Sequence, residues 1–180
     1  MMMPAQTATS ILARDCARKL AQVQWNEHHA GPHRPVRLTA REVNAWLASP
    51  WGRRRLPAAV TGVQLTCRPG WVQGQAEVNF SLLPRLAHGT WAILAAALLA
   101  GPHHISAAAR VISVQAPAAR LRLSQVGLDG RQVSSWLLQL ILREYVLPRH
   151  PQWGQNLQIK LPAGVKSVVM GRDWVRLEYA

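Results

Sequence analysis

The feature that most constrains the fold is an alternation of apolar and polar residues on both sides of a Pro-Gly turn. Residues 63–67 alternate before the turn at Arg68-Pro69-Gly70, and residues 72–80 repeat the alternation after it. A period of two places successive side chains on opposite faces of a β-strand, and a Pro-Gly pair favours a tight turn. The segment therefore predicts an antiparallel hairpin with one apolar, buried face and one polar face.

Two later segments predict hairpins of the same kind, each with two strands joined by a short turn. Their strands are residues 105–114 with 119–126, and residues 165–170 with 174–179. The first of these pairs turns near Ala116-Pro117, and the second turns at residues 171–173. In the first pair, Leu121 and Leu123 point to one face while the arginines beside them point to the other. Asp129-Gly130 predicts a further turn.

Three segments predict helices, at residues 10–29, residues 39–49 and residues 134–147. The second has the sharpest start, because Thr39 and Glu42 form a capping box in which each side chain satisfies a free backbone N–H of the other residue. The third begins at Ser134 as its N-cap and stops before Pro148. Its apolar residues cover most of its circumference, which predicts that the rest of the fold encloses it.

Together these elements predict one α+β domain. Residues 1–9 are expected to form a flexible tail and residues 10–180 a single domain, since 180 residues are few for two hydrophobic cores. The apolar run at residues 91–100 fits a short helix or a buried strand. The economical arrangement is a curved antiparallel sheet of hairpins wrapped around the helix at 134–147.

The chain is strongly basic, with a formal charge of +13 from 21 basic and 8 acidic residues. Such a charge attracts anions, including nucleic acid and anionic lipid head groups. Arginine far outnumbers lysine and alanine is abundant, so a GC-rich coding bias accounts for the charge equally well. The only basic run is Arg53-Arg54-Arg55, which is either a solvated patch or a site for phosphates.

No catalytic or metal site is predicted. The acidic residues are scattered, and the serines and glycines lie outside the motifs of hydrolases and nucleotide-binding loops. The side chains within each of the two adjacent histidine pairs diverge, so neither pair chelates a metal alone. The two cysteines, Cys16 and Cys67, match no metal-ligand spacing and leave a single disulfide open. We therefore expect a protein that is not an enzyme and needs no cofactor.

The apolar interior is the remaining candidate site. A sheet wrapped around a helix can be a filled core, or it can open into a groove for an acyl chain, and the sequence is consistent with both. The residues that would line such a groove come from the third helix and from the strands that face it. They are Trp136, Leu137, Leu140, Ile141, Tyr145, Val78, Phe80, Leu121 and Leu123.

Three motifs resemble those of a group of bacterial cell-envelope proteins. They are the helix start Leu38-Thr39-Ala40-Arg41-Glu42-Val43-Asn44-Ala45-Trp46-Leu47, the turn Val126-Gly127-Leu128-Asp129-Gly130-Arg131-Gln132-Val133-Ser134, and the hairpin start Leu161-Pro162-Ala163-Gly164-Val165-Lys166-Ser167-Val168-Val169. Ser134 stands where that group usually carries proline. The layout is similar to that of the LmeA-like phospholipid-binding family, which is related in shape to tubular lipid-binding domains.

The resemblance covers about half of the chain and implies a half barrel that binds a lipid or another apolar ligand at the cell envelope or in the periplasm. It supplies no catalytic residues. The N-terminal apolar segment of that group has no counterpart here, so a cytoplasmic location stays open.

Three functions therefore follow as hypotheses. The first is non-enzymatic binding of a lipid or another apolar ligand, with an anionic membrane surface as a second partner. The second is a basic protein associated with nucleic acid. The third is a structural or assembly protein with a filled core, which would use exposed tryptophans and sheet edges.

Overall fold

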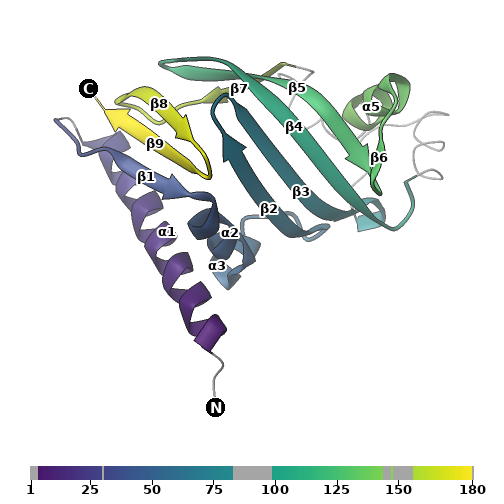
Figure 1. The fold of residues 1–180 in the computed structure, drawn as a ribbon, viewed down its shortest axis with the longest axis horizontal. Helices are drawn as coiled ribbons and strands as arrows, with labels where there is room; N and C mark the ends of the chain where they lie inside the picture. The colour runs from purple at the N-terminus through teal and green to yellow at the C-terminus, as the bar shows by residue number, and fades with distance from the viewer. Residues whose placement is uncertain (1–3, 30, 83–98, 144–146, 148–155, 180) are drawn as a thin grey trace.

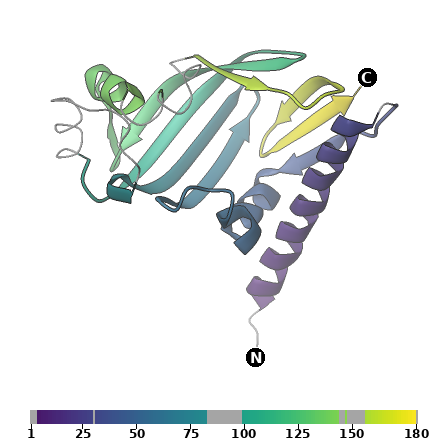
Figure 2. The same cartoon turned by 180° about the vertical axis from the view of Figure 1, so that it is seen from behind.

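Two antiparallel sheets form the centre of the computed structural model, which describes residues 4–29, 31–82, 99–143, 147 and 156–179 (Figure 1). The fold is α+β, as predicted, and the sheets stay open at their edges. A long N-terminal helix lies at one end of the molecule and the larger sheet at the other, with two short helices between them (Figure 2).

The larger sheet has six strands in the order β2-β3-β4-β5-β6, with β7 pairing beside β6 on β5. Its strands are β2 (Val60–Arg68), β3 (Trp71–Asn79), β4 (Pro102–Gln115), β5 (Ala118–Leu128), β6 (Arg131–Gln132) and β7 (Asn156–Lys160). The first two predicted hairpins are confirmed, with Cys67 opposite Val72 in one and Gln115 opposite Ala118 in the other. Gly70 turns the first hairpin at φ 75°, a conformation that costs glycine little. The turn predicted at Asp129-Gly130 joins β5 to β6.

The third predicted hairpin is also confirmed, but it belongs to a different sheet. It comprises β8 (Val165–Gly171) and β9 (Trp174–Tyr179), and β9 pairs with β1 (Val36–Thr39) in a sheet of order β1-β9-β8. The prediction that all three hairpins belong to one continuous sheet is therefore wrong. The sequence interpretation missed β1, because four residues next to a proline-rich linker carry too short an alternation to show a strand.

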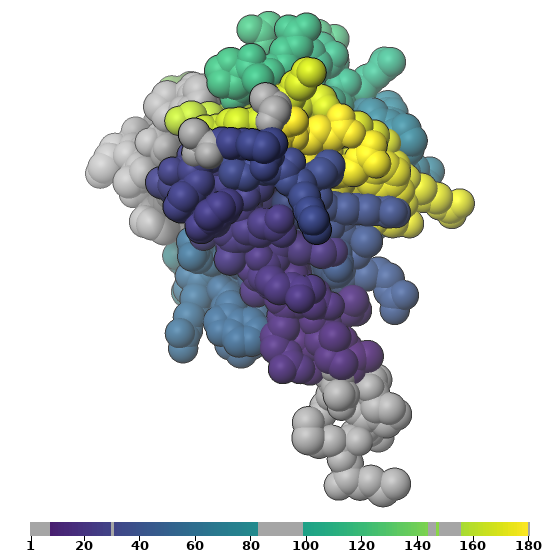
Figure 3. Space-filling model, turned by 90° about the vertical axis from the view of Figure 1, so that its left-hand side faces the viewer, coloured from purple at the N-terminus to yellow at the C-terminus, as the bar shows by residue number. Residues whose placement is uncertain are grey.

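The N-terminal helix α1 (Pro4–His28) begins earlier than expected. Residues 4–9, predicted to be part of a flexible tail, form its first turns. The helix runs along one flank of the molecule, with β8 and β9 beside its C-terminal half (Figure 3). Its buried residues Ala13 and Cys16 lie on the side of α1 that packs on α2.

Helix α2 (Ala40–Ala48) confirms the predicted capping box. The Glu42 N–H donates to the Thr39 hydroxyl at 3.2 Å, and the Thr39 N–H donates to the Glu42 carboxylate at 2.8 Å. The same carboxylate accepts a hydrogen bond from the Lys19 ammonium of α1 at 2.6 Å. The short helix α3 (Pro50–Arg53) follows at once, with Ser49 as the cap shared by both helices.

The structure does not confirm a sheet wrapped around a long apolar helix. Helix α5 (Ser135–Ile141) has seven described residues and lies at one end of the six-stranded sheet (Figure 1). It buries Leu140 and Ile141, whereas Trp136 is 56% exposed. Ser134 takes the predicted N-cap position without a side-chain hydrogen bond to the helix. The rest of the predicted helix includes residues 144–146, which lie outside the described residues.

The apolar run at residues 91–100 falls mostly outside the described residues as well. Of its two described residues, Leu99 is 1% exposed and packs in a core cluster with Phe80, Leu140 and Ile141, and Ala100 is exposed. This cluster covers one end of the apolar face of the six-stranded sheet, because Val78, Ile105 and Leu128 pack against it from β3, β4 and β5.

The edge strand β2 is closed by a side chain from α2. The Asn44 amide donates to the Leu65 carbonyl at 2.9 Å and accepts from the Leu65 N–H at 2.7 Å, as a neighbouring strand would. Two residues on, the Cys67 carbonyl accepts from the Asp173 N–H at 2.9 Å. Unpaired edge groups attract other strands, so these contacts both dock α2 on the sheet and occupy its edge.

Asn44→Ala should loosen this docking. Loss of both hydrogen bonds leaves the Leu65 N–H and carbonyl unpaired, so we expect the free energy of unfolding to fall by about 1–3 kcal/mol. Chemical denaturation measures that change, and hydrogen exchange should show faster exchange of the Leu65 amide. Gln75→Ala is the control, since Gln75 bonds Gln64 on the exposed face. Unchanged exchange at Leu65 in Asn44→Ala would contradict the assignment.

Candidate functional site

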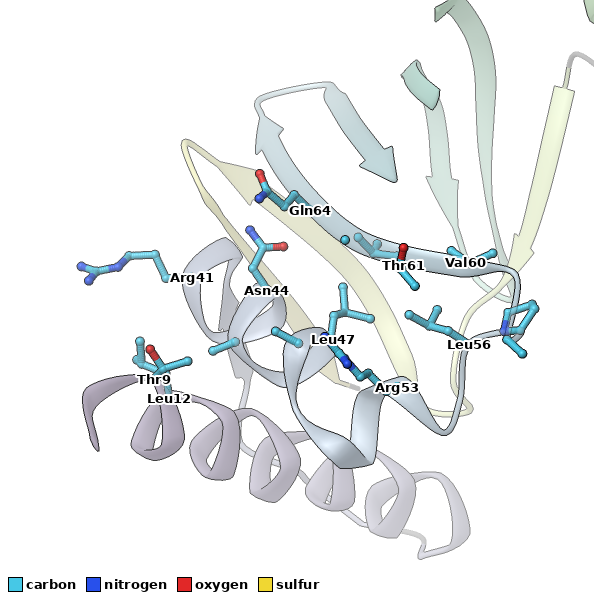
Figure 4. A pocket seen from close by; sticks show the side chains of 16 residues that line it. Thr9, Leu12, Arg41, Asn44, Leu47, Arg53, Leu56, Val60, Thr61 and Gln64 are labelled. Carbon is cyan, nitrogen blue, oxygen red and sulfur yellow. The ribbon is translucent and has the colours of Figure 1, made fainter. Parts of the chain in front are cut away.

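A cleft of about 630 Å³ lies where α2 and α3 face strand β2 (Figure 4). We call it the α2 cleft. Thr9 and Leu12 of α1 close one end of it, and the start of β2 forms the opposite wall. Most of the wall is apolar, from Leu12, Ala45, Leu47, Ala48, Leu56, Pro57, Ala58, Val60 and Val63. The side chains of Arg41, Asn44, Arg53, Thr61 and Gln64 bring the polar groups.

The tight turn from α2 into α3 shapes the cleft. The Ser49 hydroxyl donates to the Trp46 carbonyl at 2.6 Å and accepts from the Gly52 N–H at 3.3 Å, so a single residue ends one helix and starts the next. A β-carbon on Gly52 would overlap the backbone of Trp46 and Leu47. Glycine at this position therefore allows α3 to fold back against α2, and this places Arg53 in the cleft wall.

Strand β2 bends where it forms the other wall. Its register with β3 shifts between Thr61 and Gln64, and Gly62 takes φ 60° in this bulge. A bulge kinks a strand and redirects its side chains. The bend carries residues 60–64 past the ends of α2 and α3, and all five of them line the α2 cleft.

A second hollow adjoins the first between α1 and the α2–α3 turn. This Trp51 groove has a volume of about 450 Å³ and shares Thr9, Ala45 and Ala48 with the α2 cleft. Its other walls are Ser10, Ala13, Ser49, Pro50 and Trp51, and Trp51 is 52% exposed. The two hollows therefore form a continuous and largely apolar surface, with Arg41 and Arg53 on different sides of the α2 cleft (Figure 4).

The structure separates the three arginines that the sequence groups together. Arg53 lines the α2 cleft. Arg54 and Arg55 are exposed beyond the end of α3, and their backbone N–H groups bond to Pro50 and Gly52. Arg41, which the sequence interpretation did not select, lies in the cleft wall with Arg53.

The residues predicted to line an acyl groove lie elsewhere. Phe80, Leu140 and Ile141 fill the core cluster, and Val78 and Leu137 pack against it. Leu121 is buried between β4 and β7, and Leu123 is half-buried on β5. Trp136 is exposed, and Tyr145 lies outside the described residues. None of the eight described residues of this set lines the α2 cleft.

Two titratable groups between α1 and α2, Glu42 and Cys16, each keep one protonation state at neutral pH. Burial opposes ionisation of Glu42, but hydrogen bonds from Lys19 and Thr39 outweigh it and hold the pKa of this carboxyl below its ordinary value of 4.5. Burial, with a smaller effect of Glu42, raises the pKa of the Cys16 thiol to about 11. Cys16 and Cys67 are both free thiols.

Within the described part of the chain, no three His, Cys, Asp or Glu side chains converge as a metal site would require. No described helix is both long enough and apolar enough to cross a bilayer. Comparison with models of protein families, with curated proteins and with solved structures found no match. The resemblance to the LmeA-like family therefore stays a prediction.

Glu42 gives the fold a specific acid dependence. Because its pKa is lower in the folded chain than in the unfolded chain, its ionised form stabilises the fold above about pH 4.5, and this stabilisation is lost as the pH falls through the folded pKa. We expect Glu42→Gln to lower the free energy of unfolding by about 1.5–3 kcal/mol at neutral pH, since a hydrogen-bonded charge is removed.

Denaturation curves recorded between neutral pH and about pH 3 test this expectation. The difference in stability between the two proteins should shrink toward the acid end, because the wild-type carboxyl takes up a proton as the pH falls through its lowered pKa. Glu77→Gln is the matched control, since Glu77 is an exposed carboxylate on β3 and should leave the profile close to that of the wild type. Parallel profiles for wild type and Glu42→Gln would disprove the role of Glu42.

Proposed function

We propose that this protein binds an anionic amphiphile, such as a phospholipid or a fatty acid, in the α2 cleft, and that it does so without catalysing a reaction. The observation that carries the proposal is the pairing of Arg41 and Arg53 with an apolar wall that continues into the Trp51 groove. An amphiphile presents the same two chemistries, an anionic head and an apolar chain.

The charges in the cleft suit an anionic head group. Among the described residues, neither Arg41 nor Arg53 forms an ion pair with a carboxylate. An arginine guanidinium binds phosphate or carboxylate through two parallel hydrogen bonds. Asn44 uses its amide on the backbone of Leu65 and the Gln64 side chain accepts from Gln75, so the polar side chain best placed to supplement the arginines is Thr61.

The size and lining of the two hollows suit an acyl chain. Each hollow lies within the range of about 300–1,000 Å³ that is typical of ligand sites, and such sites are mostly apolar with a few polar groups that orient the ligand. The chain would lie along Ala45, Ala48 and Trp51, where the cleft meets the groove. The resemblance described above supports the same class of ligand and a location at the cell envelope, which we include in the proposal.

Binding of lysophosphatidic acid, with monoacylglycerol as its uncharged counterpart, tests the proposal on the purified full chain. We expect Arg53→Gln to weaken binding of lysophosphatidic acid about tenfold or more, because a charge-assisted hydrogen bond is lost. Arg54→Gln makes the same change of charge one residue away and should bind as the wild type does. Ala48→Trp should weaken both ligands, because its ring would occupy the junction of the two hollows.

Native mass spectrometry and isothermal titration calorimetry provide the measurements. Thermal denaturation of each variant checks that the fold is retained. No binding of lysophosphatidic acid by the wild type, or equal losses in Arg53→Gln and Arg54→Gln, would refute the proposal.

A further inference from the structure

Four arginines gather on the polar face of the six-stranded sheet, away from the α2 cleft. Arg68 of β2 pairs with Trp71 of β3, Trp71 pairs with Arg110 of β4, and Arg110 pairs with Arg122 of β5. Residues directly opposite each other in antiparallel strands point to the same face. The side chains of Arg68, Trp71, Arg110 and Arg122 therefore form one row across the sheet. Arg120 lies two residues from Arg122 and therefore joins the same face.

Two exposed apolar side chains accompany these arginines. Trp71 is 42% exposed, and Ile112 is 49% exposed. Ile112 lies beside the arginines, because it lines a shallow hollow with Arg120 and Arg122. We call Arg68, Trp71, Arg110, Ile112, Arg120 and Arg122 the arginine patch.

The positive charge of the patch is not balanced by neighbouring acids. All four arginines are exposed, and in the described part of the chain none of them pairs with a carboxylate. Among the described residues, Arg122 donates a long hydrogen bond from Nε to the Asn156 amide oxygen at 3.5 Å. Glu77 is the single acidic residue within the strands of this sheet, and it lies six residues from Trp71 along β3, a distance of about 20 Å.

We propose that the arginine patch docks the protein on the surface of a bilayer that contains anionic phospholipids. Guanidinium groups bind lipid phosphates, and basic residues near such a surface each strengthen binding. Tryptophan favours the boundary between head groups and acyl chains, where its ring is apolar and its N–H is polar. Nucleic acid would also attract the arginines and Trp71, but it gives no role to the exposed side chain of Ile112.

The position of the patch allows this contact. Its residues lie toward the ends of β2–β5 that carry the β2–β3 and β4–β5 turns. The β4–β5 turn lies at the top of Figure 1, whereas the N-terminal end of α1 lies at the bottom. A flat surface can therefore contact the end of the sheet that carries the β4–β5 turn without contacting the N-terminal end of α1. The proposal concerns a surface separate from the α2 cleft and does not depend on ligand binding there.

Co-sedimentation of the full chain with vesicles tests the proposal. The vesicles are phosphatidylcholine alone, or phosphatidylcholine with about one third phosphatidylglycerol. We expect binding to the anionic vesicles that weakens as salt is added, because salt screens exposed charges. Arg110→Gln/Arg122→Gln should weaken it roughly twenty- to thirty-fold, given a loss of about fivefold for each arginine. Trp71→Ser should reduce the binding that persists at high salt.

Arg14→Gln/Arg34→Gln is the matched control, because it lowers the net charge equally at exposed positions on α1 and in the following linker. It should bind vesicles within about twofold of the wild type, since exposed charges beyond a screening length contribute little. Arg53→Gln should also bind vesicles normally, so a failure of the cleft proposal remains distinguishable from a failure of this one.

Three results would overturn the docking role. The first is no co-sedimentation of the wild type with anionic vesicles at low salt. The second is an equal loss in the patch variant and in the charge-matched control. The third is loss of single-stranded DNA binding in Arg110→Gln/Arg122→Gln while vesicle binding is unchanged, which would assign the patch to nucleic acid. Circular dichroism of each variant verifies that it is folded.

Discussion

The rest of the N-terminal half depends on the carboxylate of Glu42, which joins three elements at one point. It accepts hydrogen bonds from the Thr39 backbone, where β1 ends, and from Lys19 of α1, while its own backbone N–H starts α2. The first residue of α2, Ala40, donates its N–H to the Asp173 carbonyl in the β8–β9 turn. A buried carboxylate is costly without such partners, so loss of any one of these contacts destabilises the packing of α1, β1 and α2 together. The α2 cleft lies on the helix that this contact orients.

Local chemistry explains why several elements could be predicted from the sequence. The three hairpins each contain their own turn, and the capping box of Thr39 and Glu42 needs only four consecutive residues. Pairing between strands that are distant in the sequence has no comparable local sequence signal. Strand β1 pairs with β9 across more than a hundred residues, and β7 pairs with β5 rather than with its neighbour in sequence. The packing of the apolar helix was unpredictable for the same reason. Leu140 and Ile141 pack against Phe80 and Leu99, and the pattern of residues 134–147 does not show which distant residues they contact.

The candidate site was less predictable than the fold for the same reason. The arginine run and the stop of α2 before Pro50 were visible in the sequence, but their relation to β2 was not. Gly52 decides which arginine faces the cleft, because a close approach of α3 to Trp46 and Leu47 is possible only without a β-carbon. The arginine patch depends on register in the same way. Arg68, Arg110 and Arg122 are far apart in the chain and become neighbours only when three hairpin strands align with β2.

The burial of Cys16 gives the chain an internal reporter of helix docking. Its side chain is fully buried between α1 and α2, and a pKa of about 11 leaves almost no thiolate at neutral pH. An alkylating reagent can therefore react only when α1 separates from α2, so the labelling rate counts those openings. Since Thr9 and Leu12 of the same helix line the α2 cleft, a molecule bound there would hold α1 in place and slow the labelling of a residue that it never touches.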